Sequence, residues 1–186
     1  STCGLDLKDA MQVAVDSETS RDFEPTIEGV TVGLSSGTSG NRGLFLASSS
    51  ERAIWVAAVL QRILGWSFKK RKIAFFLRAN SNLYSSVQSN FLTFEYFDLL
   101  KPIQEHLERI QKVQPHIVVG QPSLLVRLAH AQNDGRISIR PQRIFSVAEV
   151  LSDEDEALIS LAFGIRVDQV YQCTEGLFGQ TLSLIH

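Results

Sequence analysis

Short apolar runs alternate along the chain with stretches whose apolar residues recur at helical spacing. Compact apolar runs bounded by turn residues are typical of strands, and the periodic stretches are typical of helices. The predicted strands are Val30–Leu34, Ile73–Leu77, Thr93–Phe97, Ile117–Val119, Arg143–Val147 and Arg166–Tyr171. Strand and helix alternate about five times, which predicts an α/β fold: a mostly parallel sheet of repeated βαβ units, flanked by helices on both faces.

Capping residues mark the ends of several predicted helices. Ser48 with Glu51 three residues later is a capping-box signature. Ser152 is followed by four acidic residues, which suit the positive end of a helix dipole. Pro122 can open a helix at its first position. These signals place helix starts just after residues 48, 121 and 152.

One further helix is predicted to begin at Pro102. Its apolar stripe comprises Ile103, Leu107 and Ile110, and His106 is expected on its polar, solvent-facing side. None of the four histidines has a partner at a spacing typical of catalysis or metal binding. We therefore expect no histidine to be catalytic.

Composition and charge narrow the classes of function. The chain has 186 residues, with 20 acidic and 18 basic side chains, and a formal net charge of −2. That balance argues against binding to nucleic acid, which needs a basic face. The two cysteines lack the spacing of a zinc site, and the longest apolar stretch, Ala53–Leu60, is too short for a membrane span. Without a signal-peptide pattern at Ser1–Asp9, the predicted location is cytoplasmic.

Four polar loops follow predicted strands. They begin after Leu34, Leu77, Val147 and Tyr171. Ligands of parallel sheets bind at the carboxyl ends of the strands. All four loops are therefore expected to lie on one rim of the sheet.

The first of these loops, Ser35–Gly43, is suited to close contact with an anion. It contains three glycines, three serines, one threonine and Arg42. Backbone N–H groups, hydroxyls and one positive charge are thus available to the phosphates of a nucleotide. The loop is expected to join a buried strand to the helix capped by Ser48. It follows neither the Walker A nor the G-x-G-x-x-G pattern, and a solvated surface loop is the alternative.

The motif Tyr171-Gln172-Cys173-Thr174-Glu175-Gly176 spans the end of the last predicted strand and the start of the loop after it. A threonine hydroxyl beside a carboxylate can bind a phosphate oxygen and Mg2+, respectively. A structural turn is the alternative for this segment taken alone.

Together and in this order, the motifs resemble those of the adenylate-forming superfamily of acyl- and aryl-CoA ligases. The family's phosphate loop is S-S-G-T-T-G, and Ser35–Gly40 is S-S-G-T-S-G; its later motif is Y-G-x-T-E, and Tyr171–Glu175 is Y-Q-C-T-E. Val147-Ala148-Glu149 stands where the family has a strand end that packs on adenine. The similarity covers roughly residues 30–180 and is greatest to the phenylacetate-CoA ligase and coenzyme F390 synthetase branch.

The resemblance implies roles for individual residues. The implied phosphate-binding residues are Ser35, Ser36, Gly37, Thr38, Ser39 and Gly40, with Arg42 in place of the charge of the family's lysine. The implied adenine-binding residues are Ala148, Glu149, Tyr171 and Gln172. Thr174 would contact the α-phosphate and Glu175 would hold Mg2+, so these two are the implied catalytic residues.

The activity implied by the resemblance is ATP-dependent activation of a carboxylic acid. The acid, expected to be aromatic, would attack the α-phosphorus, release pyrophosphate and remain as an acyl-adenylate. Transfer to a thiol would follow in the intact enzyme, with coenzyme A and an acyl carrier protein as the alternative acceptors. A non-catalytic nucleotide-binding or interaction module of the same fold is the other hypothesis, because Asn41-Arg42-Gly43 replaces the family's Pro-Lys.

The resemblance also implies a domain organisation. Residues 1–28 are expected to be an N-terminal connecting segment with a short helix near Met11–Val15, and residues 29–186 a partial ATP-binding α/β core. The family's lysine-bearing C-terminal domain has no counterpart, so the chain is interpreted as a fragment that is inactive or impaired alone. Exposed sheet edges and helix faces of such a fragment would favour self-association into a homo-oligomer.

Overall fold

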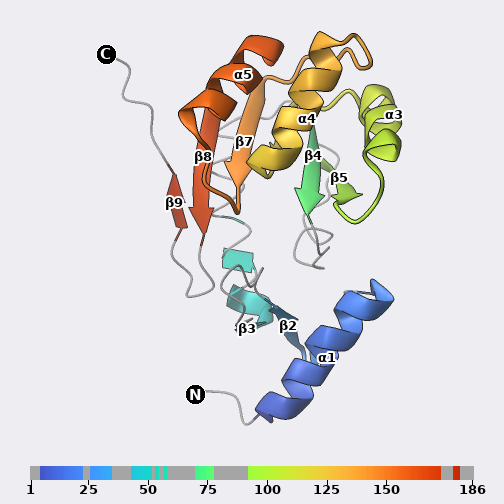
Figure 1. Cartoon of the computed structure of the whole chain (residues 1–186). Coiled ribbons are helices and arrows are strands. Elements are labelled where there is room, and N and C mark those ends of the chain that lie inside the picture. Colours follow the sequence, from blue (N-terminus) through green and yellow to red (C-terminus); the bar gives the residue numbers. More distant parts are fainter. Residues whose placement is uncertain are drawn as a thin grey trace. The chain divides into compact units, whose positions relative to one another are not determined.

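A computed structural model of the chain defines two compact units (Figure 1). The smaller unit comprises residues 1–68 and 79–88, and the larger unit comprises residues 69–78 and 89–186. The structure describes residues 5–22, 26–34, 43–51, 53–54, 57, 70–77, 92–172 and 178–180, with the side chains of 171–172 and 178–180 left aside. The predicted boundary between residues 28 and 29 remains a prediction.

The smaller unit pairs one helix with a small antiparallel sheet. Helix α1 (Leu7–Ser20) begins at Asp6, whose side chain accepts a hydrogen bond of 2.7 Å from the N–H of Lys8. The helix is longer than the short segment predicted near Met11. Its buried Ala10 and Ala14 pack against Val32 of the sheet. The small alanine side chains allow this close approach of helix and strand.

The sheet of the smaller unit has the order β1-β2-β3, and both pairings are antiparallel. Its strands are β1 (Thr26–Ile27), β2 (Val30–Leu34) and β3 (Leu44–Ala47). The strand β2 was predicted, but β3 was not. The expectation that Ser35–Gly43 joins a strand to a helix is therefore wrong, because this segment joins β2 to β3. The expectation that Leu34 ends a strand of the parallel sheet is also wrong.

The capping box predicted at Ser48 is confirmed. The N–H of Ser48 donates to a carboxylate oxygen of Glu51 at 2.8 Å, and the N–H of Glu51 donates back to the Ser48 hydroxyl at 3.3 Å. Among the described residues that follow, 49–51, 53–54 and 57 are helical. The hydrogen bonds from Ser48 lower the pKa of the Glu51 carboxyl.

The larger unit contains the predicted α/β sheet. The strand order is β5-β4-β6-β7-β8-β9, with five parallel strands and an antiparallel β9 at one edge. The strands are β4 (Arg71–Leu77), β5 (Leu92–Asp98), β6 (Ile117–Gly120), β7 (Arg143–Val147), β8 (Val167–Gln172) and β9 (Phe178–Gln180). The mostly parallel α/β sheet predicted from the alternating pattern is thus confirmed.

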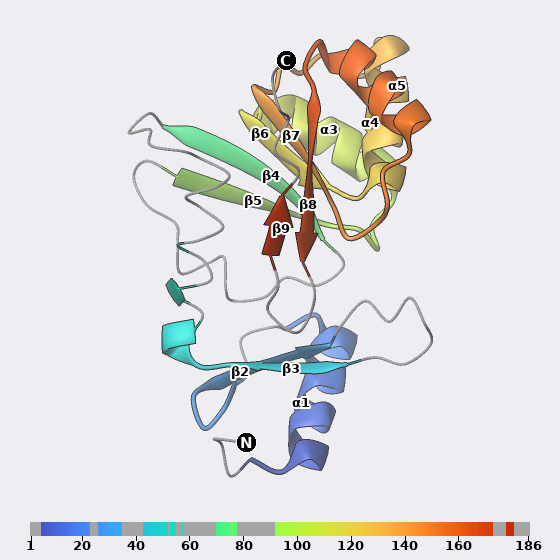
Figure 2. The ribbon, with the colours of Figure 1, turned by 90° about the vertical axis from the view of Figure 1, so that its left-hand side faces the viewer.

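Three helices cover one face of this sheet (Figure 2). They are α3 (Ile103–Val113), α4 (Pro122–Asn133) and α5 (Asp153–Phe163). Each helix lies in a crossover connection between two parallel strands: α3 between β5 and β6, α4 between β6 and β7, and α5 between β7 and β8. The three connections run in the same direction across the sheet. Right-handed crossovers that run in one direction place their helices on the same face. The connection from β4 to β5, residues 78–91, runs across the sheet in the opposite direction and lies outside the described residues. Helices on the second face therefore remain a prediction.

The main core lies between the sheet and these helices. Phe76 of β4 and Phe97 of β5 are 0% and 1% exposed, and their rings stack with centroids 4.4 Å apart. Ile73 and Phe75, on the opposite face of β4, are buried as well. Strand β4 is therefore buried on both faces, as its continuous apolar sequence predicts.

His106 is buried, which contradicts its predicted position on the polar side of α3. It is 4% exposed and packs edge-on against the rings of Phe76 and Phe97. Because it is three residues after Ile103 and four before Ile110, it falls on the apolar face of the helix. Burial lowers the pKa of the His106 imidazole and so favours its neutral form.

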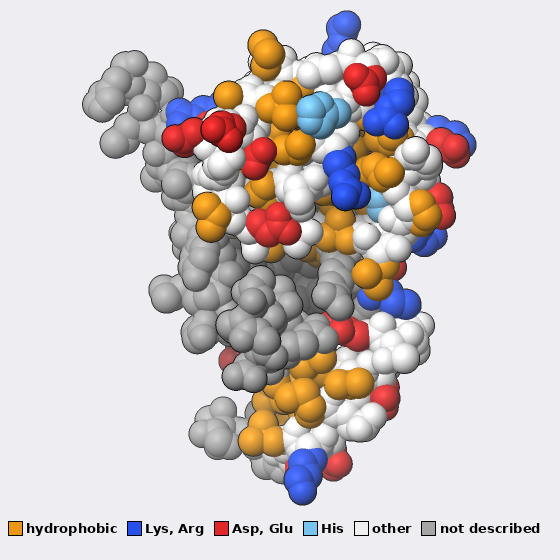
Figure 3. Space-filling model, viewed as in Figure 1, with side chains coloured by type: hydrophobic (Ala, Val, Ile, Leu, Met, Phe, Trp, Pro, Cys, Tyr) orange, Lys and Arg blue, Asp and Glu red, His pale blue; other side chains and the backbone are white. Residues whose placement is uncertain are grey.

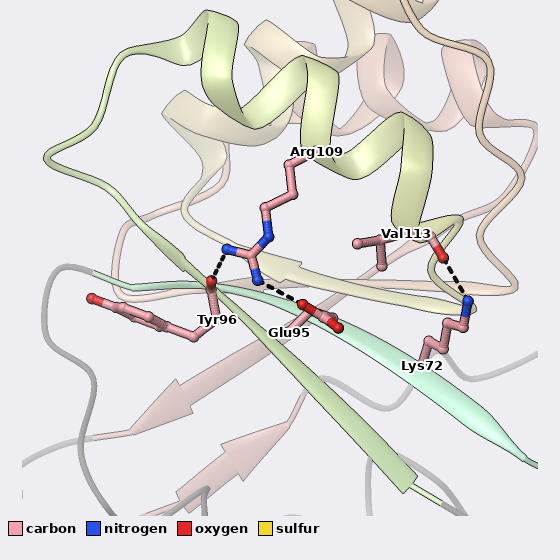
Figure 4. A network of polar contacts seen from close by, with 5 residues as sticks. All are labelled: Lys72, Glu95, Tyr96, Arg109 and Val113. Atoms are coloured by element: carbon pink, nitrogen blue, oxygen red, sulfur yellow. Dashed lines mark hydrogen bonds and ion pairs between the residues drawn. The ribbon is translucent and has the colours of Figure 1, made fainter.

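Polar contacts in the C-terminal half of α3 tie this helix to the sheet (Figure 4). Arg109 donates to the carboxylate of Glu95 and to the carbonyl of Tyr96, each at 2.6 Å. The ammonium group of Lys72 donates to the carbonyl of Val113 at 3.1 Å. A cation at the last turn of a helix is favourable because the free carbonyls there carry partial negative charge. Helix α3 is thus fixed across β4 and β5.

The outer surface of the larger unit is mixed in character. Acidic and basic side chains alternate with apolar ones over the helix-covered face (Figure 3). Within the described residues, no helix has both the length and the apolar character needed to cross a membrane.

Candidate functional site

The carboxyl ends of the parallel strands form one rim of the larger unit. Because β4, β7 and β8 are parallel, the loops after Leu77, Val147 and Gln172 leave the same side of the sheet, as predicted. Gly120 of β6 lies opposite Ser146 of β7, and Val147 lies opposite Val170 of β8. The segments that follow β6, β7 and β8 are therefore neighbours along the rim, where ligands of such sheets bind.

Ala148 forms a tight turn at the end of β7. Its φ is +67°, and the N–H of Glu149 donates to the carbonyl of Val147 at 2.9 Å. A three-residue turn with positive φ at its centre is rare for a residue other than glycine, and it is strained. Ala148 and Glu149 are exposed, and the next side chain, Val150, is 91% exposed. The predicted adenine-binding pair thus occupies an open, strained turn on the rim.

The Glu149 side chain reaches the first turn of the neighbouring helix α4. One carboxylate oxygen accepts from the Ser123 N–H at 3.4 Å, and the other accepts from the Ser123 hydroxyl at 3.3 Å. A carboxylate at this position is stabilised by the free N–H groups and the dipole of the helix. The contact joins two residues that are 26 positions apart and belong to adjacent strand-to-helix connections.

Tyr171 and Gln172 belong to β8 rather than to the loop after it. Tyr171 pairs with Gly179 and Gln172 pairs with Phe178, so β8 and β9 form an antiparallel hairpin. The residues between them, 173–177, lie outside the described residues and include Thr174 and Glu175. The predicted catalytic pair thus lies in the sequence between β8 and β9, and β8 is paired with β7.

The predicted phosphate-binding residues also lie outside the described residues. These are Ser35, Ser36, Gly37, Thr38, Ser39, Gly40 and Arg42. The strands on either side of them are described, and Leu34 pairs with Leu44. The two described residues Leu34 and Leu44, which come before and after the predicted loop, therefore lie opposite one another in the β2–β3 pairing.

Magnesium binding remains a prediction. The residue assigned to it, Glu175, is outside the described part of the chain. Within the described part, no group of three or more His, Cys, Asp or Glu side chains could hold a metal ion.

Ser123 is a residue of this rim that the sequence analysis did not identify. The sequence did contain a signal for it, since Gln121-Pro122-Ser123 directly follows the apolar run that forms β6. The loop after β6 belongs to the same rim as the loops after β4, β7 and β8. The polar residues after β6 were therefore candidate site residues too, because they also follow the carboxyl end of a parallel strand.

Sequence comparisons and structure comparisons gave different results. No protein-family model matches the chain, and no curated protein matches it. Solved structures do match. The 2-hydroxyisobutyryl-CoA ligase in complex with 2-HIB-AMP and CoA has a TM-score of 0.62 and 15% identity, over 87% of this chain and 39% of that chain.

Two further structures give similar values. The anthranilate CoA ligase AuaEII in complex with anthranoyl-AMP has a TM-score of 0.59 and 16% identity, over 78% of this chain and 30% of that chain. The McyG A-PCP complexed with phenylalanyl-adenylate has a TM-score of 0.60 and 11% identity, over 95% of this chain and 34% of that chain. The chain therefore has the fold of part of these three proteins and spans between 30% and 39% of their lengths.

Proposed function

We propose that this chain is the ATP-binding part of an adenylate-forming ligase. The observation that carries the proposal is the Ala148–Glu149 turn, which lies on the carboxyl rim next to β8, the strand that leads into Thr174-Glu175. Two motifs that resemble those of the superfamily thus start from adjacent strands of a sheet with the superfamily's fold. The third motif, Ser35–Gly40, lies between two paired strands.

The proposed reaction is the attack of a substrate carboxylate on the α-phosphorus of ATP. A bond forms between the carboxylate oxygen and that phosphorus, and the bond to the β-phosphate oxygen breaks, so pyrophosphate leaves with its electron pair. Adenine would lie against Ala148, Glu149, Tyr171 and Gln172, and the β- and γ-phosphates against Ser35–Gly40 and Arg42. Thr174 would contact the α-phosphate, and Glu175 would bind Mg2+. The protein would contribute positioning and charge neutralisation.

The proposed substrate class is an aromatic carboxylic acid, and the proposed acceptor of the acyl group is a thiol. The resemblance to the phenylacetate-CoA ligase branch supports the aromatic acid, as does the structural similarity to a protein described as an anthranilate CoA ligase. The structural match to a ligase with bound CoA supports coenzyme A as the thiol. An acyl carrier protein remains the alternative acceptor.

The proposed phosphate site can be tested by removing its hydroxyls. Ser36→Ala combined with Thr38→Ala should weaken ATP binding, because each lost hydrogen bond to a charged phosphate is worth roughly 1.5–3 kcal/mol. Titration calorimetry with MgATP measures the change, and Ser138→Ala, which removes an exposed hydroxyl after α4, is the matched control. Equal ATP affinity in the double variant and the control would refute the assignment of this loop.

A non-catalytic nucleotide-binding module is the second candidate function. It is favoured by Asn41-Arg42-Gly43, which stands where the superfamily has Pro-Lys. Such a module would bind ATP but would not form an acyl-adenylate. Acid-dependent exchange of pyrophosphate into ATP separates the two functions.

A further inference from the structure

The first turn of α4 lacks a cap from its own sequence. Its N-cap residue, Gln121, makes no side-chain capping bond, although its carbonyl accepts from the N–H groups of Leu124 and Leu125 at 3.0 and 2.9 Å. Pro122 has no N–H to donate. The N–H of Ser123 is therefore the first donor of the helix that needs an acceptor from elsewhere.

Glu149 provides that acceptor from the end of a different strand. Its carboxylate receives both the N–H and the hydroxyl of Ser123, at 3.4 and 3.3 Å. The other helix starts that a side chain caps in the described chain use local residues: Asp6 for α1, Ser48 for the helical residues after it, and Ser152 for α5. Helix α4 thus depends on the strand-end turn for its cap, and the turn depends on the helix for its anchor.

The anchor matters because the turn is strained. Ala148 has a φ of +67°. The Val150 side chain is 91% exposed, so its packing adds little to hold the turn in this conformation. Buried Leu151 fixes the chain beyond the turn, and Val147 in β7 fixes it before. Between these two points, the described contacts of the turn are its own bond from Glu149 to Val147 and the Ser123 contact. Strain of this kind persists only where neighbouring groups enforce it.

We propose that Ser123 is a positioning residue, which holds the Ala148–Glu149 turn in the conformation that receives the adenine base. This inference rests on the proposed function, since it presumes that a nucleotide binds on the rim. A turn that is already fixed does not have to be ordered when the base arrives, so less of the binding free energy is lost. Ser123 would act through Glu149 and would not touch the nucleotide.

The test uses the full chain and three substitutions. Ser123→Ala and Glu149→Gln weaken the contact, and Ser123→Thr restores the hydroxyl. Glu154→Gln, which neutralises an acidic residue in the first turn of α5, and Ser138→Ala are the matched controls. Melting temperatures establish that each variant is folded.

The first measurement is hydrogen exchange at the Glu149 amide, which reports the turn without any nucleotide. Ser123→Ala and Glu149→Gln should accelerate exchange roughly two- to fivefold, the size expected for an exposed contact between a carboxylate and a helix N-terminus. Ser123→Thr and both controls should exchange at the original rate. Unchanged exchange in both weakened variants would overturn the inference.

The second measurement compares the affinities for ATP and for inorganic tripolyphosphate, which lacks the base. The weakened variants should lose roughly two- to fivefold in ATP affinity and keep their tripolyphosphate affinity. If hydrogen exchange at the Glu149 amide became faster but the ratio of the affinities for ATP and tripolyphosphate did not change, the positioning role would be overturned. The proposed function would still stand. If the unaltered chain bound neither compound, the proposed function would fail, and the positioning role would fail with it.

Discussion

Two apolar runs of similar sequence character, Val30–Leu34 and Ile73–Leu77, have different roles in the fold. The first forms β2, the middle strand of an antiparallel sheet with one helix packed on it. The second lies within β4, which is buried on both faces and paired with parallel strands on both sides. An apolar run therefore predicts that a strand exists, but it does not predict the direction of its partners.

The difference follows from what each run packs against. Among the described residues, the buried apolar cluster of the smaller unit consists of Ala10, Ala14 and Val32. The cluster around Phe76 in the larger unit extends over five strands and three helices. The free energy of unfolding should therefore depend more strongly on β4 than on β2.

The largest expected effect is that of Phe76→Ala. This residue is 0% exposed and stacks on Phe97, so its truncation should cost about 3–5 kcal/mol. Val32→Ala in β2 removes two methyl groups and should cost about 1.6 kcal/mol. Hydrogen exchange of the β6 and β2 amides in a urea series measures each loss.

Leu161→Ala is the control for these truncations, because Leu161 is 81% exposed and should change stability by less than about 0.5 kcal/mol. Equal losses for Phe76→Ala and Val32→Ala would contradict the contrast between the two strands.

A second test adds one methyl group to a glycine in each unit. A Cβ at Gly120 of β6 would lie 3.3 Å from a methyl carbon of Leu124 and 3.4 Å from the Cβ of Phe76. Because these neighbours are buried, Gly120→Ala should cost about 1–3 kcal/mol. A Cβ at Gly33 of β2 would meet the ring of Phe45, which is only half-buried and able to swing aside.

Gly33→Ala should therefore cost less than Gly120→Ala when both are measured by urea unfolding. A greater loss at Gly33 would show that β2 and β3 are packed as tightly as the main sheet.

The third prediction concerns pH. Burial lowers the pKa of His106 below its ordinary value of 6.5, against the opposing effects of the Asp98 carbonyl and the carboxylates of Glu105 and Asp98. As the pH falls below about 6.5, the unfolded chain binds a proton that the folded chain does not. The larger unit should lose stability over that range, by at most about 1.4 kcal/mol per pH unit for this residue.

His106→Phe keeps an aromatic ring beside Phe76 and removes the titrating group, so it should reduce this pH dependence. Burial also lowers the pKa of His116, which leaves part of the dependence in place. Substitution of the exposed His130 by Gln is the control. Melting temperatures between pH 5 and pH 8 measure the effect, and an identical profile for His106→Phe would contradict it.

The smallest expected effect compares two helix caps. The hydroxyl of Ser152 accepts from the N–H of Asp155 at 3.1 Å, and Ser152→Ala should cost about 1 kcal/mol. Ser48 forms a reciprocal box with Glu51, so Ser48→Ala should cost at least as much. Thermal melts of both alanine variants, with Ser→Thr at each site as controls, test this. A smaller loss of stability for Ser48→Ala than for Ser152→Ala would show that the Ser48–Glu51 capping box contributes little to stability.

The sequence predicted those parts of the fold that depend on local signals. Ser48, Pro122 and Ser152 marked helix starts correctly, because capping depends on a few neighbouring residues. The strand β3 was missed because the glycine-rich segment before it was interpreted as a loop between a strand and a helix, although it joins two antiparallel strands. His106 was misplaced because it was treated as a polar side chain, although its spacing from Ile103 and Ile110 matches the apolar face.

For the site, the sequence predicted the shared rim of the loops after β4, β7 and β8. The adenine-binding role of Ala148 and Glu149, which lie on that rim, stays a prediction. The sequence did not predict the strained conformation of Ala148 or the contact with Ser123. That contact joins two crossover connections, and it arises only once β6 and β7 are paired. Such long-range contacts depend on strand order, which local patterns do not specify.

The most direct test of the central claim is ATP–pyrophosphate exchange by the protein that carries this chain, with pooled aromatic and aliphatic carboxylic acids. We expect exchange that requires an acid, is strongest with the aromatic members of the pool, and is abolished by Glu175→Gln in a folded protein. A folded protein that binds MgATP but shows no acid-dependent exchange would contradict adenylation. That result would identify the chain as a non-catalytic nucleotide-binding module.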